Sequence, residues 1–112
     1  MLITLDINKT IRYKCKSDTL GEPTYFLLGV ISKKNMISIQ NIWGESTQGD
    51  LTYECVKKGL KGWENFKDSN NNNVEFKYND DGCIEIIPFH ILIELGAEIL
   101  KLNILSELDK KN

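Results

Sequence analysis

The sequence predicts a small α+β domain, in which an antiparallel sheet built from hairpins packs against two or three helices. Three observations lead to this fold class. The chain has 112 residues, the length of one ordinary domain. Short apolar runs rich in β-branched and aromatic residues stand between turn signals, as strands do. Longer segments repeat apolar residues at helical spacing. We therefore expect a single domain over residues 1–112.

The amino-terminal part predicts a hairpin over residues 2–31. Residues 11–16 contain β-branched residues in partial alternation, and a shorter strand is expected before them at 2–6. The sequence TLGEP at 19–23 is a turn signal, because glycine tolerates positive φ and proline fixes its own φ. The continuously apolar run at 24–31 then predicts a strand that is buried on both faces and pairs with the first.

The central part, residues 33–65, predicts two helices. Ser32 is expected to cap a helix through 33–43, and the polar sequence GESTQG at 44–49 is expected to be a loop. Asp50 is the expected cap of a second helix that frays toward its end, because two glycines interrupt it. Residues at positions i, i+4 and i+7 form its apolar face: Val56, Leu60 and Trp63.

An asparagine run, residues 70–73, separates this second helix from an expected hairpin at 74–87. Asparagine readily adopts turn and left-handed conformations, so the run predicts a linker rather than a site. Alternation after the run predicts one strand, and Asp81-Gly82 is a hairpin turn signal. The return strand is expected at residues 83–86.

The carboxy-terminal part predicts a helix over residues 88–104 that begins at Pro88, because proline suits a first helical turn. One apolar stripe comprises Leu92, Leu95, Gly96, Ile99 and Leu102, and a second comprises Phe89, Ile93, Ala97 and Leu100. Apolar residues therefore cover more than half of the helix circumference, which predicts a central helix or a face that awaits a partner. A last helical turn is expected from Ser106.

Composition and motifs argue against several classes of function. The net charge of −2 gives no electrostatic reason to expect nucleic acid. The amino terminus lacks a secretory pattern and the apolar segments carry too many polar residues for a membrane span, so we expect a cytoplasmic protein. The sequence contains no glycine-rich phosphate loop and no metal-ligand spacing, so no cofactor and no metal are expected. The cysteines, Cys15, Cys55 and Cys83, are expected to be reduced structural thiols.

Candidate catalytic groups have plainer explanations. His90 is the only histidine, and no neighbour that would orient it as a general base can be identified. The sequence from Asp68 resembles the opening of a calcium loop but lacks the glycine and the bidentate glutamate that such a loop needs. Asp80 and Asp81 precede a glycine and fit a turn. We therefore expect a protein that is not an enzyme.

Several segments resemble small tail-region proteins of bacteriophages. They are a strand, turn and apolar strand at 11–32, the motif Gly62-Trp63-Glu64-Asn65, a short Asp-x-Asn loop, Val-Glu-Phe, and a terminal helix ending ILKLNILSELDKKN. The nearest functional class is the tail assembly chaperones of long-tailed phages. This resemblance implies a non-enzymatic protein that binds the tape measure protein and helps to recruit tail tube proteins in the host cytoplasm. A minor structural protein of the head–tail region and a phage-encoded inhibitor of a host protein are the alternatives.

Such a binding protein needs exposed apolar area, which the carboxy-terminal helix could supply. A helix at 51–63 is expected to form one wall of a groove beside it. The candidate contact residues are Trp63, Phe89, Leu92, Ile93, Ile99 and Leu100. The alternative that all six belong to the core stays open, and self-association through the same helix is a companion expectation.

Overall fold

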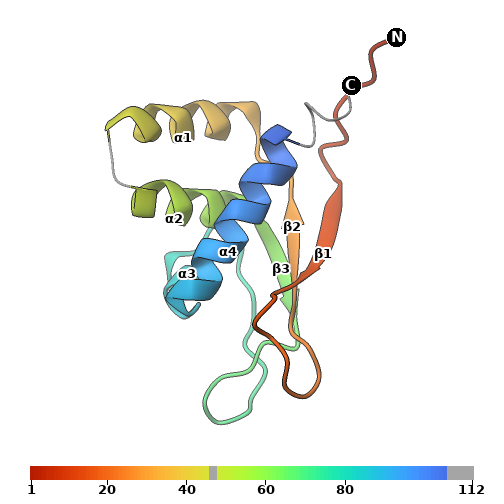
Figure 1. The fold of residues 1–112 in the computed structure, drawn as a ribbon, viewed down its shortest axis with the longest axis vertical. Coiled ribbons are helices and arrows are strands. Elements are labelled where there is room, and N and C mark those ends of the chain that lie inside the picture. The colour runs from red at the N-terminus through yellow and green to blue at the C-terminus, as the bar shows by residue number, and fades with distance from the viewer. Residues whose placement is uncertain (46–47, 106–112) are drawn as a thin grey trace.

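The computed structural model describes residues 1–45 and 48–105. The three strands are β1 (Thr10–Lys14), β2 (Tyr25–Gly29) and β3 (Leu60–Glu64). The helices are α1 (Lys33–Glu45), α2 (Gln48–Gly59), α3 (Asp81–Glu85) and α4 (Phe89–Leu100), and a π-helical turn, Lys101–Leu105, continues α4. The strands form one antiparallel sheet in the order β1-β2-β3, with the helices to one side of it (Figure 1). The predicted α+β class is thereby confirmed.

The first hairpin is also confirmed, although it is shorter than expected. β1 and β2 pair antiparallel, from Thr10 opposite Gly29 to Lys14 opposite Tyr25. The turn between them contains Gly21 at φ 66°, in the left-handed region that glycine tolerates. The predicted strand at 2–6 is wrong. β2 ends opposite Thr10 and leads into α1, so β2 offers residues 1–9 no partner and they lie outside the sheet.

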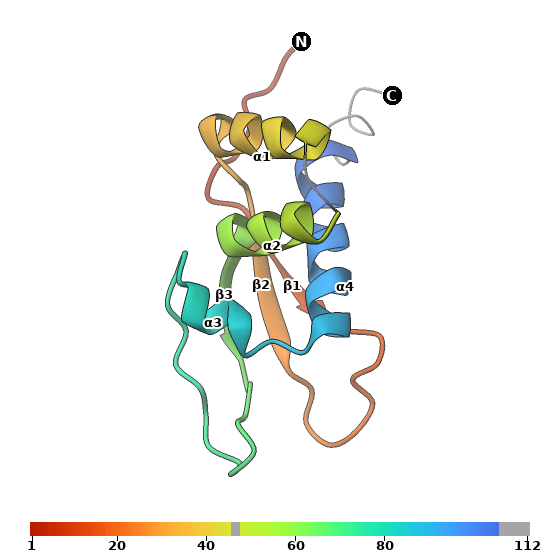
Figure 2. The ribbon, with the colours of Figure 1, turned by 90° about the vertical axis from the view of Figure 1, so that its left-hand side faces the viewer.

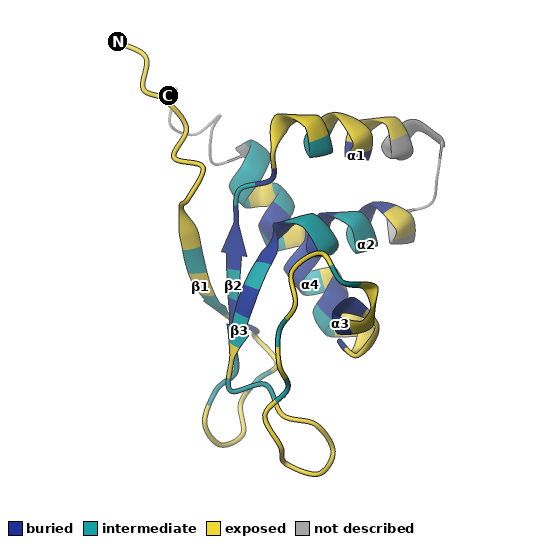
Figure 3. Cartoon of the chain, turned by 180° about the vertical axis from the view of Figure 1, so that it is seen from behind, coloured by how far each residue is buried: buried dark blue, intermediate teal, exposed yellow. Residues whose placement is uncertain are grey.

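One face of the sheet packs against α2 and α4, and α1 packs on α2 (Figure 2). The core includes buried side chains from both strands and helices: Phe26, Leu28, Leu60, Val56, Leu95 and Ile99. The opposite face of the sheet carries the exposed Arg12, Lys14 and Glu64. Figure 3 shows this asymmetry, since β2 is largely buried whereas β1 is exposed at alternate positions.

Helix α1 begins as predicted. The hydroxyl of Ser32 accepts a hydrogen bond from the Asn35 backbone N–H at 3.2 Å, which satisfies one of the free donors of the first turn. The helix extends to Glu45 and α2 begins at Gln48, so most of the predicted loop is helical. The remainder of that loop, residues 46–47, lies outside the described residues. Asp50 stands in the first turn of α2 and is not its cap.

The helix predicted to run past residue 60 is wrong, because α2 ends at Gly59 and residues 60–64 form β3. β3 pairs antiparallel with β2, from Tyr25 opposite Glu64 to Leu28 opposite Leu60. A bulge between Leu27 and Leu28 shifts the register. Hydrogen bonding to an edge of β2 that would otherwise be free outweighs the local helical pattern, which the two glycines had already weakened.

The hairpin predicted over residues 74–87 is also wrong. Residues 74–77 form no regular structure and residues 81–85 form the short helix α3. The side chain of Asp80 caps α3 by accepting a hydrogen bond from the Cys83 backbone N–H at 3.1 Å. This position lets Ile84 and Ile87 enter the core, which a surface hairpin would not have done. An Asp-Asp-Gly sequence is therefore a helix start here and not a hairpin turn.

The asparagine run is a loop, as expected, but it links β3 to α3. The carboxylate of Asp68 accepts hydrogen bonds from the backbone N–H groups of Asn70 and Asn72, each at 2.9 Å. Asn71 adopts a left-handed conformation with φ 65°. An isolated bridge between Lys67 and Asn73 closes the loop.

The carboxy-terminal helix is confirmed at nearly its predicted bounds. Pro88 takes the N-cap position with φ −54° and ψ 143°, and its carbonyl accepts a hydrogen bond from the Leu92 backbone N–H at 2.9 Å. Beyond α4, the amide of Asn103 donates to the Gly29 carbonyl at 3.1 Å and its oxygen accepts from the Ile31 N–H at 2.7 Å. These bonds attach the end of the helical segment to the end of β2. The helical turn predicted from Ser106 lies outside the described residues.

Candidate functional site

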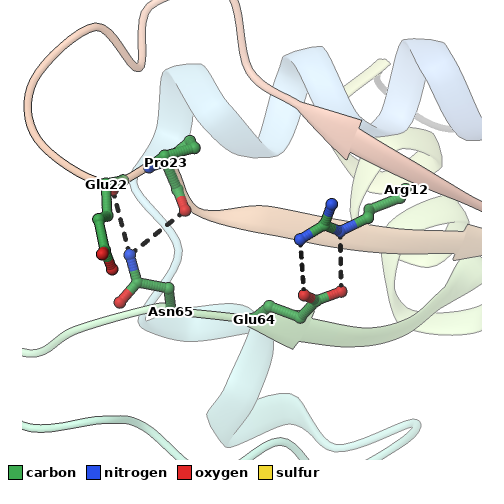
Figure 4. Close-up of polar contacts among 5 residues, drawn as sticks. All are labelled: Arg12, Glu22, Pro23, Glu64 and Asn65. Atoms are coloured by element: carbon green, nitrogen blue, oxygen red, sulfur yellow. Dashed lines mark hydrogen bonds and ion pairs between the residues drawn. The ribbon is translucent and has the colours of Figure 1, made fainter.

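Residues of the motif Gly62-Trp63-Glu64-Asn65 form hydrogen bonds that connect the end of β3 to β1 and to the turn before β2 (Figure 4). The guanidinium of Arg12 donates two hydrogen bonds to the carboxylate of Glu64, at 2.9 and 3.1 Å, across the open face of the sheet. The amide of Asn65 donates to the carbonyls of Glu22 and Pro23, at 3.1 and 3.3 Å. The Asn65 backbone is left-handed, with φ 58°. The motif therefore holds the turn at 19–24 against the sheet.

Trp63 lies at the centre of an aromatic cluster that includes Phe26, Phe66 and Phe76. Its ring meets those of Phe66 and Phe76 edge to face, each with centroids 4.9 Å apart. Its indole N–H donates to the carbonyl of Val74 at 2.7 Å. Both the apolar body and the polar group of this side chain are thus satisfied within the chain. Trp63 lies on β3 and packs within this aromatic cluster. It is therefore not part of a surface with the predicted contact residues of α4.

Helix α4 has one buried face and one exposed face. Its buried face, which includes Leu95 and Ile99, packs closely against α2. A Cβ built at Gly59 of α2 would overlap Cγ2 of Ile99, and one built at Gly96 would lie 2.7 Å from Cγ2 of Thr52. The two helices approach closely because these two positions lack side chains. α2 therefore covers α4, and the groove expected between them is not present.

The exposed face of α4 carries an apolar stripe. Phe89 is 67% exposed and Ile93 is 47% exposed, and Ala97 follows one turn later and is also exposed. These residues stand at positions i, i+4 and i+8, so their side chains are neighbours along the helix surface. Ile86, just before α4, is 50% exposed. We call Phe89, Ile93 and Ala97 the α4 stripe.

The structure places Trp63 on β3 and separates the five predicted contact residues of the carboxy-terminal helix into three groups. Phe89 and Ile93 belong to the α4 stripe, and Leu100 is partly buried against the core. Leu92 and Ile99 are buried, so a partner could not reach them unless α4 left the core. Sequence reasoning missed Ile86, because it was assigned to a strand. Its spacing from Phe89 is no signal, because Pro88 is extended and residues 86–88 are not helical.

A polar contact on the side of α4 fixes the helix to β1. The carboxylate of Glu94 accepts a hydrogen bond from the hydroxyl of Tyr13 and another from the backbone N–H of Lys16, the latter at 2.9 Å. Burial raises the pKa of Tyr13, and the hydrogen bond to Glu94 raises it further. The phenol therefore stays protonated and donates at any physiological pH. This contact holds α4 in the orientation that exposes its stripe.

His90 lies at the first turn of α4, beside a cavity of about 240 Å³. The cavity is also lined by Asp18, Thr24 and Phe66, among others. The carboxylate of Asp18 accepts a hydrogen bond from the Thr24 backbone N–H at 2.8 Å, which assigns it to the turn. Within residues 1–45 and 48–105, no group of three or more His, Cys, Asp or Glu side chains could hold a metal ion. The α4 stripe is therefore the strongest candidate site.

Comparison with protein-family models, with curated proteins and with solved structures finds no match to this chain. No helix in the part of the chain that the structure describes has the length and apolar character needed to cross a membrane. The α4 stripe is the observation that bears on function.

Proposed function

We propose that this protein is a non-enzymatic binding protein that holds an apolar helix of another polypeptide on its α4 stripe. The partner that we propose is the tape measure protein of a long-tailed phage, which would make the protein a tail assembly chaperone. The observation that carries the proposal is the exposure of Phe89 and Ile93 on a helix whose opposite face is fully used by the core. The resemblance around Trp63 supports the choice of partner.

The position of the exposed residues supports binding more strongly than their number does. Single exposed apolar side chains are common and need no explanation. Phe89 and Ile93, however, stand on consecutive turns of one helix, and Glu94 on the side of that helix accepts a hydrogen bond from Tyr13 of β1. A rigid apolar stripe avoids the entropy cost of ordering a surface on binding. This favours a preformed contact surface.

The shape of the stripe favours a helical partner. From Phe89 to Ala97 the stripe is about 12 Å long, given the rise per residue of an α-helix. Two large side chains, at positions 89 and 93, precede a small one at position 97. A partner helix could therefore pack beside Phe89 and Ile93 and approach the backbone near Ala97. Tape measure proteins offer long apolar helices that need such protection before assembly.

The test is co-expression with the tape measure protein encoded in the same genome, with the soluble yield of that protein as the readout. The variant Phe89→Lys/Ile93→Lys places two charges in the stripe without touching the core. Leu20→Lys is the matched control, because Leu20 is 87% exposed in the turn between β1 and β2. Buried interface anchors contribute about 2 kcal/mol or more each, so the loss of both, about 4 kcal/mol, should weaken binding roughly 1,000-fold.

We expect the wild type and Leu20→Lys to keep the tape measure protein in solution and to co-elute with it on size exclusion. The double variant should fold normally and do neither. Equal performance of the double variant would remove the α4 stripe as the contact. If the wild type forms no complex and does not raise the soluble yield, the proposed partner is wrong. Retention of the protein in finished particles would favour a structural role in the head–tail region.

A further inference from the structure

The amino-terminal segment is a strand-like sequence without a partner strand. Residues 1–9, which we call the arm, are all exposed and lie outside the sheet (Figure 1). Ile3, Leu5 and Ile7 alternate with Thr4 and Asp6, which is the pattern of a strand with one apolar face.

The arm is held loosely on its own molecule. Ile7 is 71% exposed, and Leu5 and Ile7 help to line a cavity of about 390 Å³ beside Val30 and Lys61. This cavity opens to solvent, so the side chains of Leu5 and Ile7 are packed only in part. A turn at the base of the arm is held by two exposed hydrogen bonds, from the Asn8 and Lys9 backbone N–H groups to Asp6, at 3.1 and 3.2 Å. Opening this turn would therefore cost little.

β1 is the strand that could receive the arm. It is an edge strand, and the other edge strand, β3, is flanked by the segment that follows it, through bonds from Trp63 to Val74 and from Lys61 to Tyr78. In the order β1-β2-β3 only one side of β1 is paired. Along that edge Ile11 and Tyr13 are half-buried on the helix-facing side, whereas Arg12 and Lys14 are exposed on the open side. A strand added to β1 would need apolar residues opposite the first pair and acidic or polar residues opposite the second.

The arm of a second copy meets these requirements in one antiparallel register. We propose that two copies associate about a two-fold axis at Lys9, with residues 4–8 of each pairing with residues 10–14 of the other. In this register Leu5 faces Tyr13 and Ile7 faces Ile11 of the second copy. The opposed pairs are, in full, Thr4 with Lys14, Leu5 with Tyr13, Asp6 with Arg12, Ile7 with Ile11, and Asn8 with Thr10.

Charge and apolar complementarity together select this register over its two neighbours. Shifting the pairing by two positions in one direction moves Asp6 from opposite Arg12 to opposite Thr10. Shifting it in the other direction keeps Asp6 opposite a basic residue, Lys14, but places Lys9 opposite Ile11 and moves Leu5 past the end of β1.

The proposed register therefore places the only acidic residue of the arm opposite Arg12, which would bond to Asp6 as well as to Glu64, twice per dimer. It also places the two Lys9 side chains near one another, which weakens the dimer. The proposed contact consists of only two five-residue strand pairings, which is small for a protein interface. The dimer should therefore be weak and should dissociate on dilution.

The first test measures self-association of the full chain by sedimentation velocity over a wide range of concentrations. We expect a reversible dimer that Leu5→Lys/Ile7→Lys abolishes and that Asp6→Lys weakens roughly tenfold, because it reverses two cross-strand charge pairs. The controls are Leu20→Lys and Ile93→Lys, which should dimerise as the wild type does. A wild type that stays monomeric at every concentration overturns the proposal. So does a dimer that Ile93→Lys abolishes, because it would use the α4 stripe.

The second test determines the register. In Lys9→Cys the new thiol of one copy lies opposite the same thiol of the second copy. The separation of their Cα atoms is within the range that a disulfide accepts, so oxidation should give a covalent dimer on non-reducing gels. In the adjacent variant Asn8→Cys the thiols of the two copies would face one another only in the register that places Asp6 opposite Thr10. The three native cysteines are buried and do not compete. Cross-linking of Asn8→Cys in preference to Lys9→Cys, or of neither, overturns the pairing.

Discussion

The close contact between Gly59 of α2 and Ile99 of α4 predicts a substitution whose effect on stability changes sign. Gly59 does not have a positive φ, so alanine can adopt its backbone conformation. The added methyl group would overlap Cγ2 of Ile99 and lie 3.3 Å from two further carbons of that side chain. Overpacking of this kind costs about 1–3 kcal/mol, whereas the gain in helix propensity is at most about 1 kcal/mol. Gly59→Ala should therefore destabilise the wild type by about 1–2 kcal/mol.

The same substitution should stabilise the variant Ile99→Ala. Ile99 is fully buried, so truncation to alanine leaves a cavity and costs about 2–5 kcal/mol. In that background the methyl group at position 59 no longer meets Cγ2, and it fills part of the cavity. Burial of one methylene contributes about 0.8 kcal/mol, to which helix propensity adds. Gly59→Ala should then raise stability by about 1 kcal/mol, so that the coupling energy between the two sites is about 2–3 kcal/mol.

Urea unfolding of the four proteins, followed by circular dichroism and by tryptophan fluorescence, measures this cycle. For a small domain, 2 kcal/mol corresponds to about 1 M in the unfolding midpoint. Effects of Gly59→Ala that are equal in the two backgrounds within about 0.5 kcal/mol would refute the close packing of α2 on α4. Agreement between the two probes checks that unfolding has two states.

Three further predictions concern other parts of the fold. Asn65→Ala should cost about 2 kcal/mol, from lost hydrogen bonds and left-handed strain, whereas Asn65→Gly should cost about 1 kcal/mol because glycine accepts φ 58°; equal losses in urea unfolding would contradict this. Burial raises the pKa of Cys15 to about 12 and that of Cys55 to about 11, so neither thiol should react with an alkylating reagent before unfolding, as counted by mass spectrometry. The hydrogen bond from Lys57 lowers the pKa of Asp81 from its ordinary value, so the stabilising effect of this carboxylate is present at neutral pH and is lost as the pH falls through that lowered pKa. Asp81→Asn should remove this part of the acid dependence of stability, and an NMR titration that places this carboxyl at its ordinary pKa would count against it.

The elements that the sequence predicted correctly are those whose signals are local. Ser32 marks the start of α1, and the apolar spacing after Pro88 marks α4, because a cap or a helical stripe needs no distant residue. The apolar run that became β2 was recognised for a similar reason, since turn residues bound it. In these three cases local pattern and tertiary contact favour the same structure.

The wrong predictions concern segments whose secondary structure depends on contacts with residues far away in the sequence. Leu60 and Trp63 fit a helix that continues from Val56, but β2 offers them hydrogen bonds that sequence alone cannot reveal. Asp80 could begin a hairpin turn or cap a helix, and the need to bury Ile84 selects the cap. For the same reason the candidate site was predicted only in part, because burial of Leu92 and exposure of Phe89 depend on which face α2 covers.

The length of the asparagine loop can change without affecting the rest of the fold, because hydrogen bonds close the loop at its base. The Val74 N–H donates to the Phe66 carbonyl at 2.9 Å, and the Lys67–Asn73 bridge stands just inside that bond, so the base is secured whatever lies between. Doubling the length of a loop costs only about 0.6 kcal/mol in closure entropy. An epitope tag or a fluorophore-labelling sequence could therefore be inserted after Asn71, at the far end from the arm and without disturbing α4. Mutations that add or remove asparagine residues in this loop should likewise have little effect on folding.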